Sequence, residues 1–233
     1  MKKLLFWSIL LAVITLRSEN WFAKGIDAYN RGFIKEAIEY FNYSISKNED
    51  FAEGYYNLGI CYVKLGDIEK GILYYNKALT LKPKYAEAYN NKGMALRKKG
   101  DLDQAIEFYL KAIEADPKLV AAYVNLGYAF QKSEDYDEAI YYYQKALELD
   151  PKNAGACNNL RTSLYTKGLL EMAVEYYKKA IEIDKNNADA HNNLGIAYEA
   201  LGKRDLNIIH TKKAAKLGNR DAQHYLKKKQ IEW

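Results

Sequence analysis

The feature that most constrains this chain is a repeat with a period of 34 residues. When the sequence is shifted against itself by this length, the same residue types return at the same places. The coinciding sets are Tyr55, Tyr89 and Tyr123; Gly25, Gly59, Gly93, Gly127 and Gly195; Ala78, Ala112, Ala146, Ala180 and Ala214; and Pro83, Pro117 and Pro151. A fixed period of roughly 20 to 50 residues is typical of proteins that stack one small structural unit many times. The sequence therefore predicts a repeat protein.

Each unit is predicted to hold two antiparallel helices. Helix A covers about positions 2–14 of the unit and helix B about positions 17–30. In helix A, positions 4, 7, 8 and 11 follow the i, i+3, i+4, i+7 spacing of a buried helical face. One unit shows this stripe with Tyr123, Leu126, Gly127 and Phe130. The fold class predicted from this pattern is all-α.

The unit resembles the tetratricopeptide repeat (TPR). It has an aromatic residue at position 4, Leu-Gly at 7–8, Ala at 20, an aromatic residue at 24, Ala at 27 and Pro at 32. Six copies, repeats 1 to 6, cover 18–51, 52–85, 86–119, 120–153, 154–187 and 188–221, so that the repeat region spans 19–221 after a leader. The resemblance implies a right-handed superhelical solenoid of tandem helix-turn-helix repeats. Residues 222–233 are expected to form a C-terminal capping helix, because they keep the phase of the repeat and then turn polar.

Repeat 5 departs from the pattern at Arg161, which stands where the other repeats have the position-8 glycine. An arginine cannot occupy a place that is packed for a missing side chain. We therefore expect that helices A and B of this repeat move apart or that Arg161 extends past them to solvent. The contact between repeats 4 and 5 is then the expected weak joint of the stack.

No catalytic or metal-binding pattern is visible. Cys61 and Cys157 lie three repeats apart, about 20 Å or more, which predicts two small core residues rather than a disulfide. The three histidines, His191, His210 and His224, have no Cys, Asp or His at metal-ligand spacing, and no glycine-rich phosphate loop occurs. The formal net charge is +5, yet the excess lies at the two ends and the repeat body is mildly acidic. The sequence thus predicts a non-enzyme without cofactor, metal or nucleic-acid partner.

Residues 1–18 resemble a targeting segment. Lys2 and Lys3 precede the apolar run Leu4–Leu16, which has the length of a secretory signal and is shorter than the roughly 20 residues of a membrane span. We expect a signal peptide that is cleaved after Ser18 and an exported protein, in the periplasm or elsewhere outside the cytoplasm. The alternative is an uncleaved signal anchor, which would hold the protein at a membrane.

The candidate binding surface is the face of helix A opposite its buried stripe. At about 100° per residue, positions 2, 6, 9 and 13 cluster there, and in a TPR-like superhelix this face lines the concave groove. The predicted peptide-groove residues are Asn57, Asn91, Asn125, Asn159 and Asn193 at position 6, Ile60, Met94 and Tyr128 at position 9, and Lys64, Lys98 and Lys132 at position 13.

The asparagine row has two interpretations. In the first, asparagine belongs to the repeat consensus and satisfies a local polar contact. In the second, its donors and acceptors bind the backbone of an extended peptide. The second is similar to the asparagine ladder in the repeats of O-GlcNAc transferase, although no glycosyltransferase pattern is present here. The clamp by which some TPR proteins hold a chaperone carboxylate is absent, because position 5 carries no lysine in any repeat.

These observations predict a non-catalytic protein–protein interaction module that binds a protein or an extended peptide in its groove. Two alternatives belong to other classes. One is a structural or assembly scaffold that self-associates through its ends or its convex face. The other is an accessory factor of an envelope secretion or pilus assembly system.

We expect the mature protein to begin near Glu19 and to fractionate outside the cytoplasm, because cleavage after Ser18 would release the repeats intact. Intact-mass analysis of the protein from its native host checks this expectation. A soluble cytoplasmic protein that retains Met1 would contradict it.

Overall fold

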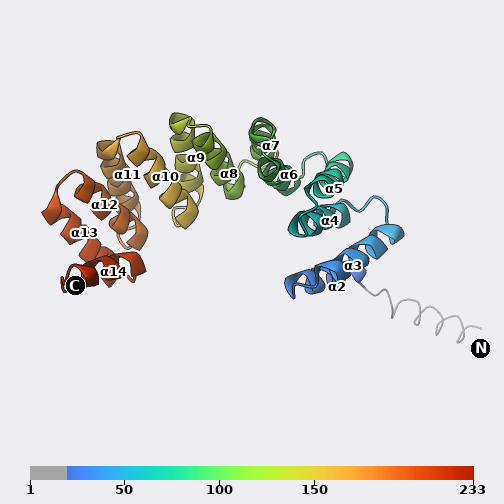
Figure 1. The fold of residues 1–233 in the computed structure, drawn as a ribbon, viewed down its shortest axis with the longest axis horizontal. Helices are drawn as coiled ribbons and strands as arrows, with labels where there is room; N and C mark the ends of the chain where they lie inside the picture. The colour runs from blue at the N-terminus through green and yellow to red at the C-terminus, as the bar shows by residue number, and fades with distance from the viewer. Residues whose placement is uncertain (1–19) are drawn as a thin grey trace, which may run out of the picture. The chain divides into compact units, whose positions relative to one another are not determined.

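The computed structural model describes residues 20–233, so the predicted leader over residues 1–18 lies outside the described residues (Figure 1). The described chain folds into thirteen α-helices and contains no strand. In chain order the helices are α2 (Trp21–Asn30), α3 (Ile34–Lys47), α4 (Ala52–Lys64), α5 (Ile68–Leu81), α6 (Ala86–Lys99), α7 (Leu102–Ala115), α8 (Val120–Lys132), α9 (Tyr136–Leu149), α10 (Ala154–Thr166), α11 (Leu170–Ile183), α12 (Ala188–Ala200), α13 (Arg204–Lys216) and α14 (Arg220–Lys228). Even-numbered helices from α2 to α12 are helix A of a repeat, and the helix after each is helix B. The predicted all-α tandem-repeat fold is confirmed.

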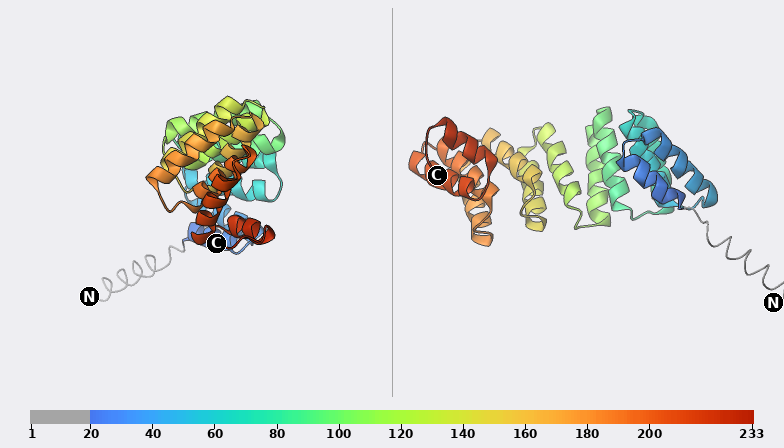
Figure 2. Two further views of the ribbon diagram at one scale, coloured as in Figure 1. Left: turned by 90° about the vertical axis from the view of Figure 1, so that its left-hand side faces the viewer. Right: turned by 90° about the horizontal axis from the view of Figure 1, so that it is seen from below.

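Two compact units divide the chain, Met1–Lys99 with α2 to α6 and Gly100–Trp233 with α7 to α14. Within each unit, consecutive helices pack side by side (Figure 2). The core of the first unit gathers around Phe41 and Leu58, and the largest core of the second extends from α9 to α12 around Tyr143 and Leu160. Each core is therefore built from contacts between neighbouring helices, as in other repeat proteins.

Helix A packs closely on helix B because a glycine at position 8 faces an aromatic ring at position 24. A Cβ atom built on Gly59 would lie 2.5 Å from the Tyr75 ring, and one built on Gly127 would lie 2.8 Å from the Tyr143 ring. Both tyrosine side chains are buried. Any side chain at these glycines would displace the ring, so the absence of a side chain sets the distance between the two helices.

In α8 the buried face differs from the predicted stripe at positions 4 and 11. In α8, Ala122 and Ala129 at positions 3 and 10 are fully buried together with Leu126. Tyr123 and Phe130, at positions 4 and 11, are only half-buried. The prediction for Tyr123 and Phe130 was wrong, because small residues lie where the helices approach most closely and the larger rings lie at the edge of the contact. In repeats 5 and 6 the residues at positions 4 and 11 are buried as predicted.

Repeat 5 is more open than repeats 4 and 6 of the same unit. Helices α10 and α11 approach each other less closely than α8 and α9 or α12 and α13 do. Arg161 is half-buried, and its Nη1 donates to Oδ1 of Asn193 in α12 at 3.1 Å. Tyr177, the position-24 ring, donates its hydroxyl to the carbonyl oxygen of Cys157 at 3.4 Å. The helices thus move apart as expected, while Arg161 extends to the next repeat rather than to solvent.

The predicted weak joint between repeats 4 and 5 is not found. Helices α9 and α10 pack as closely as the helices that join other consecutive repeats. The loosening is inside repeat 5, because Arg161 replaces a glycine that faces its own helix B and not the preceding repeat.

The turn from helix A to helix B needs one residue in the left-handed backbone region, at position 15. Gly66 has φ 91° and Gly168 has φ 72° at this place, whereas repeat 4 has Glu134 with φ 64°. The left-handed conformation costs a residue with a Cβ atom roughly 1–2 kcal/mol. Repeat 4 therefore carries backbone strain that the glycine-containing turns do not.

We expect Glu134→Gly to raise the free energy of unfolding by about 0.5–1 kcal/mol, because the relieved strain exceeds the entropy that glycine adds to the unfolded chain. Denaturant unfolding of the variant and the parent protein measures the change. Ser133→Gly is the matched control, since Ser133 has φ −80° and gains nothing from glycine. A Glu134→Gly midpoint at or below that of the parent would contradict the expectation.

Candidate functional site

In the first unit the predicted binding face lies on the neighbouring helices α4 and α6. Asn91 of α6 donates from Nδ2 to the Tyr56 hydroxyl of α4 at 2.8 Å. Burial raises the pKa of Tyr56 to about 12, and the Asn91 hydrogen bond offsets part of that rise. Asn57 instead donates from Nδ2 to the carbonyl oxygen of Glu53 in its own helix at 2.8 Å. Asn91 therefore joins two successive repeats, whereas Asn57 is bound within one helix.

Apolar and basic side chains continue this face along α4 and α6. Ile60 is half-buried, and Met94, at the equivalent place one repeat later, is 40% exposed. Lys64 and Lys98 are exposed at the ends of the same helices. The Lys64 ammonium lies 4.5 Å from the centre of the Tyr29 ring. The face thus presents amide, apolar and basic groups in the same order on both helices.

The second unit continues the asparagine row on the neighbouring helices α8, α10 and α12, whereas the lysine row ends at Lys132 of α8. Asn125 and Tyr128 of α8 are half-buried, and the Lys132 ammonium lies 5.4 Å from the centre of the Tyr128 ring. Asn193 of α12 is only 2% exposed and accepts the hydrogen bond from Arg161. Asn193 is therefore covered by protein, while the α8 residues reach the surface.

Asn159 of α10 also contacts the preceding repeat. Burial raises the pKa of the Tyr143 hydroxyl, and a hydrogen bond from the Asn159 side chain offsets part of the rise. Together with Asn91 and Asn193, Asn159 makes the local polar contact that the first interpretation of the row expects. An amide side chain offers two donor hydrogens and two acceptor lone pairs. The half-buried side chains of Asn91 and Asn159 can thus form further hydrogen bonds to a ligand, whereas the buried side chain of Asn193 cannot.

A contact between positions 4 and 23 of the same repeat was not foreseen from the sequence. In repeat 2, Tyr55 stacks on Tyr74 with 6.3 Å between ring centres. In repeat 6 the same two positions hold His191 and His210, whose Nδ1 atoms lie 3.1 Å apart. The signal available in the sequence was the recurrence of ring-bearing residues at both positions.

The protonation of the histidine pair follows from its partners. His191 Nε2 lies 3.2 Å from the carbonyl oxygen of Lys185, which can only accept, so this nitrogen carries the proton. Its Nδ1 then accepts the N–H of His210. Burial lowers the pKa of both rings. The charge of Lys213 lowers the pKa of His191 further, while the hydrogen bond to Lys185 raises it in part. The charges of His191 and Lys178 lower the pKa of His210 further. Because the two rings are in contact, a positive charge on one disfavours a positive charge on the other. The folded pair therefore favours the neutral state.

Because both pKa values are lowered in the folded state, stability should fall as the pH drops through about 6.5, the ordinary histidine value. The unfolded chain then binds protons that the folded pair resists, whereas above this pH both states are neutral and the full stability is present. Urea midpoints at pH 7.5 and 5.5 measure the loss. The double variant His191→Gln/His210→Gln should lose less than the parent, and the exposed His224→Gln control should lose as much. Equal losses for all three proteins would contradict this assignment.

Among residues 20–233, no group of three or more His, Cys, Asp and Glu side chains is placed to hold a metal ion. None of the helices in the range combines the length and the apolar character that crossing a membrane requires. Cys61 and Cys157 are both buried and unpaired, and burial raises the pKa of each thiol to about 11.

Sequence comparison identifies the family. Tetratricopeptide-repeat models match residues 52–85 and 84–152, and a further TPR-repeat model matches residues 163–202. The chain is a TPR protein. The comparison with curated proteins gives no match.

Three solved structures illustrate what this TPR protein is similar to. YrrB, a TPR protein with an unusual peptide-binding site, is 26% identical over 80% of this chain and 97% of its own, with a TM-score of 0.56. MamA (41-end) from Desulfovibrio magneticus RS-1 is 26% identical over 71% and 93%, with a TM-score of 0.60. Pseudomonas aeruginosa PilF is 18% identical over 89% and 96%, with a TM-score of 0.66, and so shares the fold alone.

Proposed function

We propose that this TPR protein is a non-catalytic module that binds a partner protein through an extended peptide laid on the helix A face. The observation that carries the proposal is the repetition of one residue order on neighbouring helices. Within the first unit, α4 and α6 both present asparagine at position 6, an apolar residue at position 9 and lysine at position 13. An extended chain that crosses both helices would meet the same three groups twice.

The chemistry of the face suits a peptide. Half-buried amides offer donors and acceptors to a backbone whose own polar groups need partners once they are desolvated. Met94, which is 40% exposed, offers a flexible apolar contact that tolerates different side chains. TPR proteins bind peptides or proteins and are generally non-catalytic, and YrrB, at 26% identity, has a peptide-binding site of its own. These likenesses support the proposal.

The lysines of this face indicate which charge of the proposed ligand is favoured. Lys64, Lys98 and Lys132 are exposed at the same end of their helices, so an acidic peptide would gain an attractive contribution in either unit. Exposed charges are screened over about 10 Å at 0.1 M salt. This part of the affinity should weaken with salt, and the amide and apolar part should not. If the leader acts as expected from the sequence, the partner would be met outside the cytoplasm.

Self-association is the alternative that one observation favours. Position 22 on helix B carries an exposed apolar side chain in every second repeat, Leu73 at 51%, Tyr141 at 53% and Ile209 at 59%. Exposed apolar side chains at a recurring position can contribute to a contact surface. Light scattering on the purified protein separates the two functions, because only a self-associating scaffold requires a stable oligomer.

The test of the proposed function starts with peptides selected on the parent protein from a displayed random library. The double variant Asn91→Ala/Met94→Ala should bind the selected peptides about tenfold or more weakly, since a lost hydrogen bond and a lost buried methionine contact together exceed about 1.4 kcal/mol. Titration calorimetry at two salt concentrations measures the affinity. Leu73→Ala is the matched control, because Leu73 is also an exposed apolar residue but belongs to helix B of the same unit.

Circular dichroism must show that the double variant retains its helices, because Asn91 also bonds to Tyr56. If the double variant folds and binds with the affinity of the parent protein, the helix A face is not the binding site. If Leu73→Ala loses affinity, the binding site lies on helix B.

A further inference from the structure

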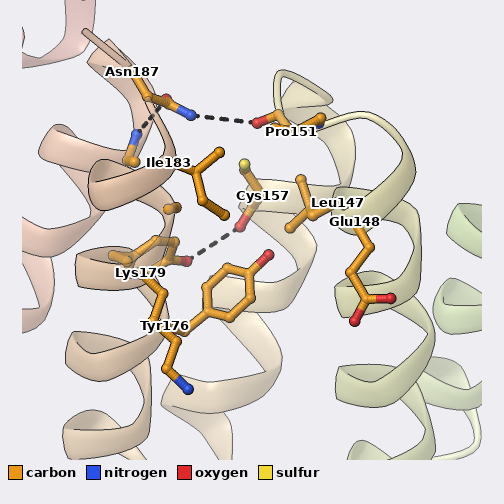
Figure 3. Close-up of a pocket in the computed structure, with 11 residues that line it drawn as sticks. Leu147, Glu148, Pro151, Cys157, Tyr176, Lys179, Ile183 and Asn187 are labelled. Carbon is orange, nitrogen blue, oxygen red and sulfur yellow. Dashed lines mark hydrogen bonds between the residues drawn. The ribbon is translucent and has the colours of Figure 1, made fainter. Parts of the chain in front are cut away.

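A pocket of about 370 Å³ opens in the second unit, where α9, α10, α11 and the start of α12 meet (Figure 3). Figure 3 shows Cys157 of α10 between Leu147 of α9 and Ile183 of α11. Leu147 and Cys157 are buried, whereas Ile183 is 79% exposed at the mouth. The pocket therefore has a covered apolar floor and is open to solvent. Its walls come mainly from helix B residues, so it is separate from the proposed peptide face.

In other repeats the side chain at position 4 points its polar end at the carbonyl oxygen of position 32 of the preceding repeat. The donor and carbonyl pairs are Tyr89 and Pro83 at 3.1 Å, Tyr123 and Pro117 at 3.0 Å, and His191 and Lys185 at 3.2 Å. In repeat 5, position 4 is Cys157 and the carbonyl belongs to Pro151. A cysteine has neither the ring nor the reach of tyrosine, and the pocket lies where that ring would be.

The remaining surroundings of a position-4 ring are also present in repeat 5. In repeat 2, Tyr55 stacks on Tyr74 at position 23, and the ammonium of Lys77 at position 26 lies 5.5 Å from the Tyr55 ring centre. The residues at positions 23 and 26 of repeat 5 are Tyr176 and Lys179, and both line the pocket. Repeat 5 thus keeps the tyrosine and the lysine that surround the Tyr55 ring in repeat 2, while its position 4 supplies no ring.

We propose that this pocket binds the phenol ring of a tyrosine side chain presented by a partner protein. The ring stacks on Tyr176 beside Lys179, and its hydroxyl donates to the Pro151 carbonyl oxygen. That oxygen accepts one long hydrogen bond, from Asn187 Nδ2 at 3.4 Å, and a carbonyl has a second lone pair. The partner tyrosine repeats the ring contacts that Tyr55 makes in its own repeat and the hydrogen bond that Tyr89 and Tyr123 make to the preceding repeat.

The surface around the mouth favours a protein as the source of the ring. A neighbouring hollow of about 310 Å³ shares Tyr176 and Lys179 with the pocket and continues to Met172 of α11, which is 52% exposed. Met172 and Ile183 together expose apolar surface around the mouth of the pocket, and a single bound ring would not cover this surface. Residues that flank a tyrosine in a partner chain would cover it, and a buried aromatic anchor with a less buried surround is typical of protein contacts.

The experiment uses p-cresol, the tyrosine side-chain analogue, with the full chain. Titration followed by NMR should show p-cresol binding about three- to tenfold more tightly than toluene, which lacks the hydroxyl that reaches Pro151. Cys157→Tyr should abolish binding by filling the pocket from within, and Cys61→Ala, at the other buried cysteine, should not change it. Absence of p-cresol binding, or equal affinity for toluene, would overturn the phenol assignment.

A measurement on the parent protein covers the case in which Cys157→Tyr fails to fold. Cys157 lines the pocket and Cys61 does not. Saturating p-cresol should slow the modification of Cys157 by a small methanethiosulfonate severalfold and leave the rate at Cys61 unchanged, as peptide mass spectrometry would show. Equal rates with and without p-cresol would place the ligand elsewhere.

The source of the ring is tested with short blocked peptides. Acetyl-Gly-Tyr-Gly-amide should displace p-cresol, and acetyl-Gly-Ala-Gly-amide should not. If p-cresol binds but the tyrosyl peptide does not compete, the occupant is a free phenol rather than a partner side chain. Asn91→Ala/Met94→Ala should bind p-cresol like the parent protein, so failure of the peptide-face proposal and failure of this one are distinguishable.

Discussion

The structure depends on one steric contact, an aromatic ring at position 24 of helix B resting on a helix A that has no side chain at position 8. Phe41, Tyr75 and Tyr143 all occupy this place beside a glycine whose Cβ atom would fall within 3 Å of the ring. The contact sets how far apart the two helices of a repeat stand, and that distance decides which other side chains meet. When Arg161 replaces the glycine, the helices separate, Tyr177 turns its hydroxyl to Cys157, and the guanidinium bonds to the next repeat.

Successive repeats are held together by a second, polar set of contacts. The group at position 4 donates to a carbonyl at position 32, and asparagine at position 6 reaches a neighbouring helix at Asn91, Asn159 and Asn193. Each bond is worth about 0.5–1.5 kcal/mol net, yet leaving its buried partner without a hydrogen bond costs more. The residues that a peptide would use are therefore partly committed to structure. A ligand on this face has to use lone pairs and hydrogens that the repeat contacts leave over.

The fold was predictable because each local sequence signal recurs with a strict period. These signals are the glycine at position 15 that turns the chain, the alanines that let helices approach, and the proline after helix B. The position of Met94 and the lysines on one face followed from helix geometry alone. The hydrogen-bond partners did not, because the partner of Asn91 is Tyr56, a residue in another repeat whose hydroxyl position depends on how the repeats stack. The buried stripe was misplaced at Tyr123 for a similar reason, since periodicity does not distinguish the centre of a contact from its edge. The histidine pair was missed because His191 and His210 meet across two helices.

Cys157 illustrates why the irregular repeat matters most. From the sequence it reads as a small buried residue, and it is buried, but its significance lies in the tyrosine that it replaces. Repeats 2, 3 and 4 fill position 4 with a phenol, and repeat 6 fills it with an imidazole that makes the same hydrogen bond. Repeat 5 keeps the stacking tyrosine, the lysine and the carbonyl and omits only the ring. In a regular solenoid every repeat supplies the same side chains to the same contacts. A selective site can therefore form where one repeat lacks a side chain that the other repeats have. The internal copies then define the chemistry of the missing group, here a phenol, more closely than the shape of the pocket would.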